Sequence, residues 1–442
     1  MNIILLSGGS GKRLWPLSND VRSKQFLKIF SVPGSANKES MVQRMYRMIK
    51  EASPSATVTI ATSESQIPQI RNQLGDDVGI SIEPCRRDTF PAIALAVSYL
   101  HDIQKIEDSE PVIVCPVDPY VEADYFNTLR FMCENVDKAN ITLMGIEPTY
   151  PSAKYGYIIP KSKDQISAVD SFKEKPDEIL AKKYMSEGAL WNGGVFAFKL
   201  SYMLEKSREL LGTSDYHKLY KSYGSLDKIS LDYAVVEKES SRNVIRFSGQ
   251  WKDLGTWNTL TEAMEQKVSG KVNADKCSNT HVINELEIPM VVLGVNNAVV
   301  AATPDGILVS DKHQSSYLKE YVSDSRPMYE RRGWGEYRVL DYKIHKDESN
   351  SLVKELVINE GKHLSYQRHS KRTEIWTFTE GFGVLVIDDK RREVSVGDTV
   401  MIAAGQKHGV KAVKGNLHII EVQIGSELVE EDIERYEYGW EW

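Results

Sequence analysis

The protein has 442 residues, of which 41% are hydrophobic and 26% are charged, so it can bury large cores and exceeds one ordinary domain in length. Its formal net charge of −7 gives no general attraction to nucleic acids or anionic membranes, so any phosphate must be bound by local groups. The four cysteines, Cys85, Cys115, Cys133 and Cys277, show no metal-binding or redox spacing, which is typical of reduced thiols in a cytoplasmic protein.

The first strand is predicted at residues 2–6, where the apolar run NIILL ends in glycines and indicates a buried strand entering a phosphate-binding loop. Because this run is short and no cleavage-site pattern follows it, we expect neither a signal peptide nor insertion into a membrane. Further buried strands are predicted at residues 58–61, 112–115 and 141–145, with helical patterns at 67–74 and 92–103. Strands that alternate with helices predict an α/β fold with a doubly wound sheet.

The pattern changes near residue 277. Between residues 277 and 311, short valine-rich runs are separated by Asn, Gly and Pro-Asp, which predicts a small all-β region of the solenoid type. Its valine-rich edges are candidates for pairing between two copies of the chain in a homodimer. From residue 337 onward, apolar and polar residues alternate between turns, which predicts an antiparallel barrel or jelly roll. We predict a short helix and a tail for the last segment, EEDIERYEYGWEW.

Glycines follow the first predicted strand in the string LSGGSGKRLWPLS. Gly8, Gly9 and Gly11 would let the backbone approach a ligand and direct N–H groups at phosphate oxygens. Arg13 and Lys24 would neutralise the charge of a triphosphate. The glycines by themselves also fit an ordinary structural turn, because the string has neither the GxGxxG fingerprint nor the spacing that leads to a Walker lysine.

A series of longer motifs is more specific. GGSGKRLWPLS with KQFL, EPCRRDTFPAIALA, CPVDPYV, GIEPTYPSAKYGYI, FKEKPD, WNGGVF, SLDYAVVEK and WKDLGTW follow one another over about the first 265 residues. In order and spacing these motifs resemble those of mannose-1-phosphate guanylyltransferases. The resemblance implies a doubly wound mixed sheet of the Rossmann-like nucleotidyltransferase type. It also implies an Mg²⁺-dependent reaction that makes GDP-mannose and pyrophosphate from GTP and mannose 1-phosphate.

The same resemblance assigns Mg²⁺ to Asp118 and Asp253. Asp118 follows a predicted buried strand, at the edge where ligands bind in open α/β sheets, and carboxylate oxygens are the ligands that Mg²⁺ prefers. The alternatives are that Asp118 caps a helix and that Asp253 is a turn residue. The catalytic set implied by the resemblance is Arg13, Lys24, Asp118 and Asp253. The implied nucleotide-binding set is Leu6, Gly8, Gly9, Gly11, Arg13, Lys24, Arg87, Asp88 and Thr89.

The sugar phosphate is assigned to a second group of motifs. Lys175 in FKEKPD would hold the phosphate and Glu174 the sugar hydroxyls, although the string also fits an ordinary charged turn. Because Lys175 precedes a proline, we predict an extended backbone at this position. The full implied sugar-phosphate set is Tyr155, Gly156, Glu174, Lys175, Asn192, Gly194 and Asp232.

The chain departs from the motifs of this family at four positions. Ser23 replaces the usual Pro, Asp88 replaces Asn, Pro119 replaces His, and Gly193 replaces Ser. These departures leave open a different sugar phosphate or a non-sugar phosphate, and CTP or UTP in place of GTP. A nucleotide-binding regulator without turnover is a further alternative.

The motifs GWGEYRVLD, LSYQRHSKRTEIWTFTEG, QKHGV and IIEVQIG resemble the cupin-type phosphomannose isomerase module that long guanylyltransferases carry. Gln367, His369, Glu374 and His408 would bind Zn²⁺ or another divalent cation in a β-barrel, although either histidine alone also fits a structural role. The implied domains are a nucleotidyltransferase domain at 1–268, a small β-helix-like linking domain at 269–325 and a cupin domain at 326–442.

Two departures weaken the prediction of isomerase activity. The family stretch QMHHHRAEHW reads QRHSKRTEIW here, so three imidazoles are lost, and the terminal YGR is replaced by YGWEW. Because an isomerase needs groups for phosphate binding and proton transfer, we expect weak or no isomerase activity. A structural or regulatory role, or another sugar phosphate, remains open for this module.

Overall fold

The computed structural model describes residues 1–9, 12–19, 22–35, 37–322, 327–345, 349–429 and 432–440, with the backbone alone for Lys12. Gly11, one of the expected nucleotide-binding glycines, lies outside the described residues. The chain divides into two compact units, which are described separately. The first comprises Met1–Leu14, Ser23–Lys267 and Lys312–Ser316, and the second comprises Trp15–Arg22, Val268–Asp311 and Tyr317–Trp442.

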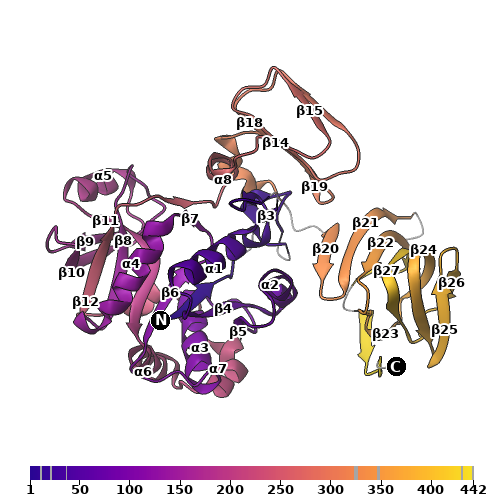
Figure 1. Cartoon of the computed structure of the whole chain (residues 1–442), viewed down its shortest axis with the longest axis horizontal. Coiled ribbons are helices and arrows are strands. Elements are labelled where there is room, and N and C mark those ends of the chain that lie inside the picture. Colours follow the sequence, from indigo (N-terminus) through magenta and orange to yellow (C-terminus); the bar gives the residue numbers. More distant parts are fainter. Residues whose placement is uncertain are drawn as a thin grey trace. The chain divides into compact units, whose positions relative to one another are not determined.

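A mixed sheet forms the centre of the first unit (Figure 1), with nine strands among the described residues, in the order β5-β4-β1-β6-β11-β8-β12-β10-β9. β1 pairs in parallel with β4 and β6, whereas β11 is antiparallel to β6 and β8. The expected doubly wound mixed α/β sheet is confirmed. The strand bounds are β1 Asn2–Leu6, β4 Thr57–Ser63, β5 Gly79–Glu83, β6 Pro111–Pro116, β8 Ile141–Ile146, β9 Tyr157–Pro160, β10 Ile166–Lys173, β11 Leu190–Lys199 and β12 Arg242–Phe247.

Helices cover both faces of this sheet. Ile3 and Leu5 of β1 pack into the core beneath α1, α2, α4 and α5, while Ile4 packs into the opposite core beneath α3 and α6. Because successive side chains of a strand point to opposite faces, a strand buried on both sides reads as a continuous apolar run. The helix bounds are α1 Met41–Ala52, α2 Ile67–Leu74, α3 Thr89–Asp102, α4 Ala123–Glu134, α5 Glu178–Ser186, α6 Leu200–Leu211, α7 Tyr216–Ser222 and α8 Trp257–Ala263.

Two short ladders lie beside the main sheet of the first unit. β2 (Phe30–Ser31) pairs with β3 (Lys38–Glu39), and β7 (Pro119–Val121) pairs with β13 (Trp251–Asp253). The second ladder is antiparallel and sets Asp253 opposite Pro119. It therefore brings a segment near residue 250 to the loop that follows β6.

The middle β region belongs to the second unit and has the repeating parallel pairing of a solenoid. Asn279 and Asn297, 18 residues apart, both have left-handed backbones (φ 48° and 50°), and Asn279 Nδ2 donates to Asn297 Oδ1 at 2.7 Å. Asparagine tolerates this conformation better than most residues, so it fits equivalent corners of successive coils. The bounds are β14 Val268–Ser269, β15 Val272–Asp275, β16 His281–Asn284, β17 Met290–Leu293, β18 Ala298–Thr303 and β19 Gly306–Asp311.

A curled antiparallel sheet forms the rest of the second unit, as expected for a cupin barrel (Figure 1). Its core contains Trp376, Phe378, Leu356 and Ile419. The predicted C-terminal helix is wrong, because Ile433–Tyr436 of that segment form a strand that pairs with β23, and this tertiary partner overrides the local pattern. The bounds are β20 Tyr329–Arg332, β21 Gly335–Ile344, β22 Asn350–Ile358, β23 Tyr366–His369, β24 Arg372–Ile387, β25 Lys390–Ser395, β26 Thr399–Ile402, β27 His408–Gly425 and β28 Ile433–Tyr436.

Among the described residues, no helix has both the length and the apolar character needed to cross a membrane.

Candidate active site and metal centre

A cavity of about 340 Å³ lies at the carboxyl ends of β1 and β6 in the first unit. Leu6, the last residue of β1, pairs with Ala61 on one side and with Pro116 on the other, so the loops that follow these strands leave the same edge of the sheet. The cavity is lined by Leu6, Ser7, Gly8, Gly9, Ala61, Glu83, Arg86, Asp88, Thr89, Ala92, Pro116 and Asp118. Five of the residues assigned to nucleotide binding from the sequence are among them.

The turn before α3 contributes a second wall of this cavity. Asp88 has a left-handed backbone (φ 68°), and its Oδ1 accepts a hydrogen bond from Thr89 N at 2.7 Å, which caps the helix. Arg87 turns away and donates to the carbonyl of Gly224, whereas its neighbour Arg86 lines the cavity. The sequence reasoning missed Arg86, because two adjacent arginines cannot be distinguished without knowing the direction of each side chain.

Glu83 lines the same cavity, beside Gly8. A Cβ atom on Gly8 would lie 4.0 Å from Glu83 Oε1, and Tyr223 donates to Glu83 Oε2 at 2.9 Å. Burial raises the pKa of the Glu83 carboxyl, while Tyr223 and the charge of Arg86 oppose this effect. Glu83 is therefore a hydrogen-bonding group in the lining of the cavity that the sequence reasoning did not assign.

Lys24 lies between the two aspartates that were assigned to Mg²⁺. Its Nζ is 2.5 Å from Asp118 Oδ2 and 4.0 Å from Asp253 Oδ1. Burial would raise the pKa of Asp118, but the charges of Lys24 and Arg13 hold it below its ordinary value, so this carboxylate stays ionised at neutral pH. Arg13 also borders Gly255, where a Cβ atom would lie 3.3 Å from the guanidinium and 2.9 Å from Asp253 Oδ1. All four groups assigned as catalytic therefore lie together.

The sugar-phosphate residues form a second cluster in the first unit. Asn192 Nδ2 donates to Asp232 Oδ1 at 2.8 Å, and Asn192 Oδ1 accepts from Gly194 N at 3.1 Å. Asn192 N donates to Gly156 O at 2.8 Å, and a Cβ on Gly156 would meet Glu174 Oε2 at 2.6 Å. Glycine is therefore required for the close approach of the Glu174 carboxylate.

Lys175 folds back over Glu174, with its Nζ 2.7 Å from Glu174 Oε1. The prediction of an extended backbone at Lys175 is wrong, because its φ is 41°, in the left-handed region. The sharp turn leaves the Glu174 side chain 14% exposed and the Lys175 side chain 61% exposed. A left-handed conformation at a residue other than glycine stores strain and is enriched at functional sites.

Asp232 carries the most perturbed carboxyl of this cluster. Burial and the neighbouring charge of Glu174 raise the pKa of Asp232 to about 6, although Asn192 and Lys175 partly oppose the shift. Two neighbouring carboxyl groups can accept hydrogen bonds from several hydroxyl groups, which is the chemistry that a sugar requires.

Tyr155 connects the sugar cluster to Asp253. Its ring lies 4.9 Å from the Trp191 ring and 5.5 Å from the Trp251 ring, measured between centroids. Burial and then the charge of Asp253 raise the pKa of the Tyr155 hydroxyl. Trp251 is on the same strand as Asp253, so this aromatic contact links the two clusters.

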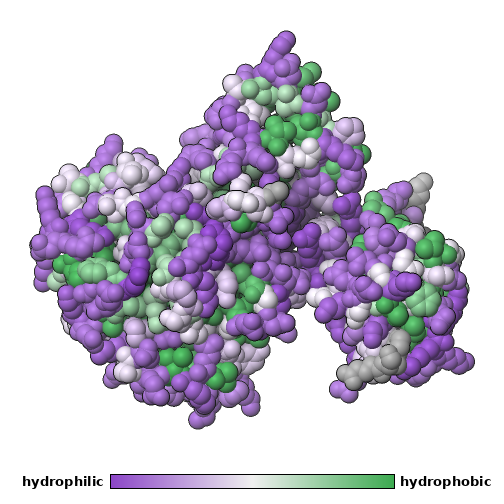
Figure 2. All heavy atoms as spheres, in the orientation of Figure 1, coloured by the Kyte–Doolittle hydropathy of each residue, from purple (hydrophilic) through white to green (hydrophobic). Residues whose placement is uncertain are grey.

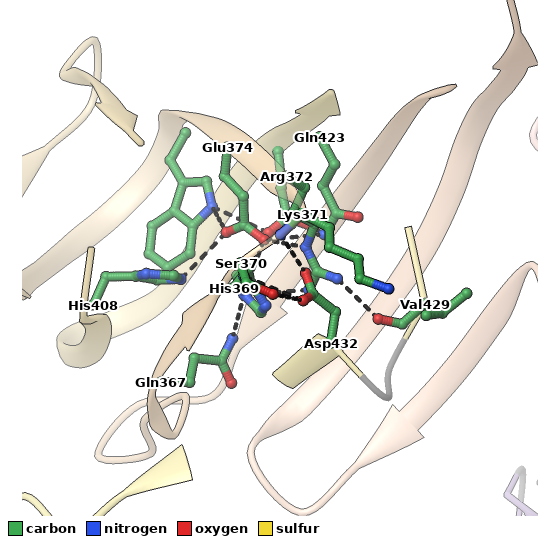
Figure 3. A network of polar contacts seen from close by, with 12 residues as sticks. Gln367, His369, Ser370, Lys371, Arg372, Glu374, His408, Gln423, Val429 and Asp432 are labelled. Atoms are coloured by element: carbon green, nitrogen blue, oxygen red, sulfur yellow. Dashed lines mark hydrogen bonds and ion pairs between the residues drawn. The ribbon is translucent and has the colours of Figure 1, made fainter. Parts of the chain in front are cut away.

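The second unit contains a buried cluster inside the curled sheet (Figure 3). Donor atoms of His369, Glu374 and His408 all lie within 4.8 Å of one another, and each side chain is no more than 2% exposed. Glu374 Oε1 is 3.2 Å from His369 Nε2, and Glu374 Oε2 is 3.3 Å from His408 Nε2. Gln367 Nε2 lies 3.3 Å from His369 Nε2. The structure brings together all four residues that the sequence assigned to a metal.

The chemistry of these donors fits a divalent cation. Burial lowers the pKa of His369 to about 4, so its imidazole is neutral at pH 7, and Arg372 donates to its Nε2 at 3.2 Å. Among the described residues, the buried His408 Nε2 has no partner in hydrogen-bonding geometry, although Glu374 Oε2 lies 3.3 Å away. The neutral His369 imidazole and the buried His408 side chain face one carboxylate and form a donor set of the kind that binds Zn²⁺ and similar ions.

A second carboxyl, from Glu421, lies beside this centre. Trp376 Nε1 donates to both Glu374 and Glu421 at 3.1 Å, and Gln423 Nε2 bridges the same two residues at 3.3 and 2.9 Å. Burial and the charge of Glu374 raise the pKa of Glu421. The sequence reasoning missed Glu421 and Gln423, although their inward positions follow the alternation in IIEVQIG.

The cavity next to this centre is rich in basic side chains. Besides Gln367, Glu374 and Glu421, it is lined by Arg332, Lys354, Arg372 and Arg435. Trp440, at the position of the family's terminal arginine, instead packs on His363, with ring centroids 4.8 Å apart.

Two protein-family models match parts of this chain. Residues 2–269 match the family model described as nucleotidyl transferase, and residues 322–438 match the model described as mannose-6-phosphate isomerase C-terminal. The xanthan biosynthesis protein XanB of Xanthomonas campestris pv. campestris is 31% identical over 99% of this chain and 98% of its own length. The chain belongs to the mannose-1-phosphate guanylyltransferase family with a mannose-6-phosphate isomerase type C-terminal domain.

Two further relatives support the membership of this guanylyltransferase family. Mannose-1-phosphate guanylyltransferase RfbM of Salmonella typhimurium is 29% identical over 98% of this chain and 96% of its own. A solved structure from Thermus thermophilus, named mannose-1-phosphate geranyltransferase, is 28% identical, with a TM-score of 0.62 over 72% of this chain and 97% of that chain. The nucleotidyltransferase class expected from the sequence is therefore confirmed.

Besides Asp88, which caps α3, two more of the four departures have a visible structural context in this fold. Pro119 lies in β7 opposite Asp253, where its missing N–H leaves the short ladder with one donor fewer. A Cβ on Gly193 would lie 3.1 Å from the side chain of Ile146, so a serine at this position requires that side chain to move.

Proposed function

We propose that the first unit makes GDP-mannose and pyrophosphate from GTP and mannose 1-phosphate. The observation that carries this proposal is the convergence of Lys24, Asp118 and Asp253 beside the glycine-loop cavity. A phosphate oxygen of mannose 1-phosphate would attack the α-phosphorus of GTP in line with the leaving group. The new P–O bond forms as the bond to the bridging oxygen of the β-phosphate breaks, and pyrophosphate leaves with the electron pair.

The protein would accelerate this step by positioning and by charge. The nucleophile is already an anion at neutral pH and needs no general base. Lys24 and Arg13 would stabilise the charge that develops on the phosphoryl oxygens. Asp118 and Asp253 fit Mg²⁺, because both carboxylates lie within 4.0 Å of a single ammonium and one is held ionised. When bound, Mg²⁺ would neutralise phosphate charge and hold the two reacting groups together.

Glu83 supports guanine as the base. A carboxylate accepts hydrogen bonds, and the guanine edge offers two adjacent donors, N1–H and the 2-amino group, whereas cytosine and uracil lack that pair. Glu83 lies beside Gly8 and lines the cavity together with Arg86. The Asp88 side chain instead caps α3.

Mannose 1-phosphate is assigned to the cluster that joins Asn192 to Asp232. Glu174 and Asp232 would accept from sugar hydroxyls, and Lys175 would hold the phosphate. The contact of Tyr155 with Trp251 supports this placement, because it sets the sugar cluster next to the strand of Asp253. Relatives whose names refer to xanthan and alginate biosynthesis support a role in supplying a polysaccharide pathway. The proposed location of this reaction is the cytoplasm.

The decisive experiment measures pyrophosphate release from GTP, ATP, CTP and UTP, each with mannose 1-phosphate, glucose 1-phosphate and a non-sugar phosphate. We expect the highest kcat/KM for GTP with mannose 1-phosphate. Glu83→Gln should lower kcat/KM for GTP about tenfold or more, because the charged acceptor is lost. Faster turnover of another combination of nucleotide and phosphate would change the assigned substrates. Tight GTP binding without pyrophosphate release would favour a regulatory protein.

For the C-terminal module we propose a metal-binding domain with weak or no isomerase activity. Ser370 and Lys371, which replace two family imidazoles, are tied to Asp432, with Ser370 Oγ donating to Asp432 Oδ1 at 2.6 Å. Gln367, His369, Glu374 and His408 would hold Zn²⁺ or a similar ion, which when bound would act as a Lewis acid towards a ligand oxygen. The test is whether the metal-loaded protein converts mannose 6-phosphate to fructose 6-phosphate. Conversion at an ordinary enzymatic rate would contradict the proposal of weak or no isomerase activity.

The proposed domain boundaries remain residues 1–268, 269–325 and 326–442, to be tested by limited proteolysis. We also propose a homodimer that uses the middle β region. Ile307 and Val309 on β19 are 63% and 68% exposed, and Figure 2 shows hydrophobic side chains gathered over part of this region. Light scattering should give twice the monomer mass, and Val309→Lys should reduce it.

A further inference from the structure

A fully buried polar network lies against the loop that follows β1 in the first unit. This loop, residues 7–9, is called the glycine loop below. Its side chains come from the loop after β1, from the segment around Lys24, from the end of β4 and from the helical turn that follows β4. None is more than 2% exposed, although all are polar. The members are Ser7, Ser23, Gln25, Thr62 and Gln66.

Gln66 is the centre of this network. Its Nε2 donates to Ser23 Oγ at 2.8 Å, and its Oε1 accepts from Gln25 Nε2 at 3.2 Å and from Thr62 Oγ1 at 2.8 Å. Ser23 Oγ in turn donates to the carbonyl of Gly9 at 3.0 Å. Gln25 Nε2 also reaches Ser7 Oγ at 3.1 Å.

These bonds tie two functional segments to each other. Ser23 and Gln25 flank Lys24 and bond to the backbone or side chains of the loop formed by Ser7 and Gly9. Lys24, between them, points the other way, to Asp118 and Asp253. Side chains that are shielded from solvent therefore fix the position of Lys24 relative to the glycine loop.

We propose that Ser23 and Gln66 are positioning residues for nucleotide binding. They turn the Gly9 carbonyl into the protein, where its negative end does not face the phosphates, and they keep the loop in the conformation that binds the triphosphate. A glycine-rich loop loses more backbone entropy on ordering than other segments, and ordering it before the ligand arrives removes that cost from binding. This proposal rests on the proposed use of GTP by the same loop.

Ser23 and Gln66 depend on each other, because the Gln66 amide donates a hydrogen bond to the Ser23 hydroxyl. Ser23→Ala leaves the Gln66 amide and the Gly9 carbonyl without their buried partner, a loss that corresponds to about tenfold or more in affinity. Thr62→Val is close in shape and leaves the bond from Ser23 to Gly9 in place, so it should have a smaller effect. Because Ser23 and Gln66 share one bond, Ser23→Ala combined with Gln66→Leu should cost less than the product of the two single effects.

The test compares steady-state kinetics and equilibrium GTP binding of the full-length protein with those of Ser23→Ala. We expect KM and Kd for GTP to rise about tenfold, while KM for mannose 1-phosphate stays unchanged. A merely structural role would reduce the amount of folded enzyme, lowering apparent kcat and leaving both KM values unchanged.

Ser207→Ala is the matched control. Ser207 is also fully buried in the first unit, and its Oγ donates to a backbone carbonyl, that of Thr213, at 2.8 Å on α6. It should lower the unfolding temperature without changing either KM. Unchanged GTP affinity in Ser23→Ala, or an equal loss in Ser207→Ala, would overturn the proposal. If the wild-type protein binds GTP but releases no pyrophosphate, the proposed transfer fails, and the binding constants still decide the role of Ser23.

Discussion

Asp232→Asn should stabilise the first unit and impair its activity, in a way that depends on pH. Burial and Glu174 raise the pKa of Asp232 from 3.8 to about 6. Above pH 6 the carboxylate is charged in both the folded and the unfolded protein, so the cost of burying that charge is fully present. Below pH 6 the folded protein takes up a proton that the unfolded chain does not bind until about pH 3.8, and the cost falls away.

The magnitude follows from the pKa difference. A difference of one pKa unit corresponds to about 1.4 kcal/mol, so the upper bound is about 3 kcal/mol. Because Asp232 is only partly buried, solvent screening reduces this to about 1–2 kcal/mol. Asparagine retains an oxygen for the bond from Asn192 and removes the charge that faces Glu174. We expect Asp232→Asn to raise the unfolding temperature at pH 8 by about 3–6 °C, with little effect at pH 4.

Differential scanning calorimetry between pH 4 and pH 8 measures this effect, and Asp170→Asn, exposed on β10, is the control. In the pyrophosphate assay, Asp232→Asn should raise KM for mannose 1-phosphate about tenfold or more, since a charged acceptor is lost. A destabilised variant at pH 8, or a gain that does not change with pH, would refute the reasoning. An unchanged KM for mannose 1-phosphate would show that Asp232 does not bind this substrate.

Three further predictions concern the other sites. Asp253→Ala should abolish pyrophosphate release with the unfolding temperature retained, and near-normal turnover in the presence of Mg²⁺ would contradict the assignment of this carboxylate. His408→Ala should lower the divalent metal that co-purifies with the protein, measured by inductively coupled plasma mass spectrometry, without changing pyrophosphate release. Arg22, whose two terminal nitrogens contact Glu285 at 2.6 and 2.7 Å, should stabilise the second unit by about 1–3 kcal/mol. Arg22→Ala should thus lower its unfolding temperature more than Lys271→Ala, which breaks an exposed pair with Glu287.

The strands and helices of the nucleotidyltransferase sheet were predictable because their apolar patterns are local. NIILL is buried on both faces, and its side chains alternate between the two cores. The alternation of RTEIWTF and HIIEVQIG similarly predicted the barrel strands. The predicted C-terminal helix was wrong, because β28 is a strand through its pairing with β23, and no feature within the segment encodes that partner.

For the candidate site too, part was predictable from the sequence and part depended on the folded structure. The residue types and their order along the chain indicated Lys24, Asp118 and Asp253, and a resemblance between motifs was sufficient to group them. Their distances depend on β7 pairing with β13, a contact between segments more than 100 residues apart that only the folded chain creates.

The sequence by itself determined the class of chemistry and the architecture, because both follow from local patterns and from the order of the motifs. What only the tertiary structure decided is the direction of individual side chains: Arg86 rather than Arg87 in the cavity, Glu421 beside Glu374, and Ser23 bonded to Gly9. These directions depend on partners that are distant in the chain, and burial then makes each unpaired polar group too costly to leave unsatisfied.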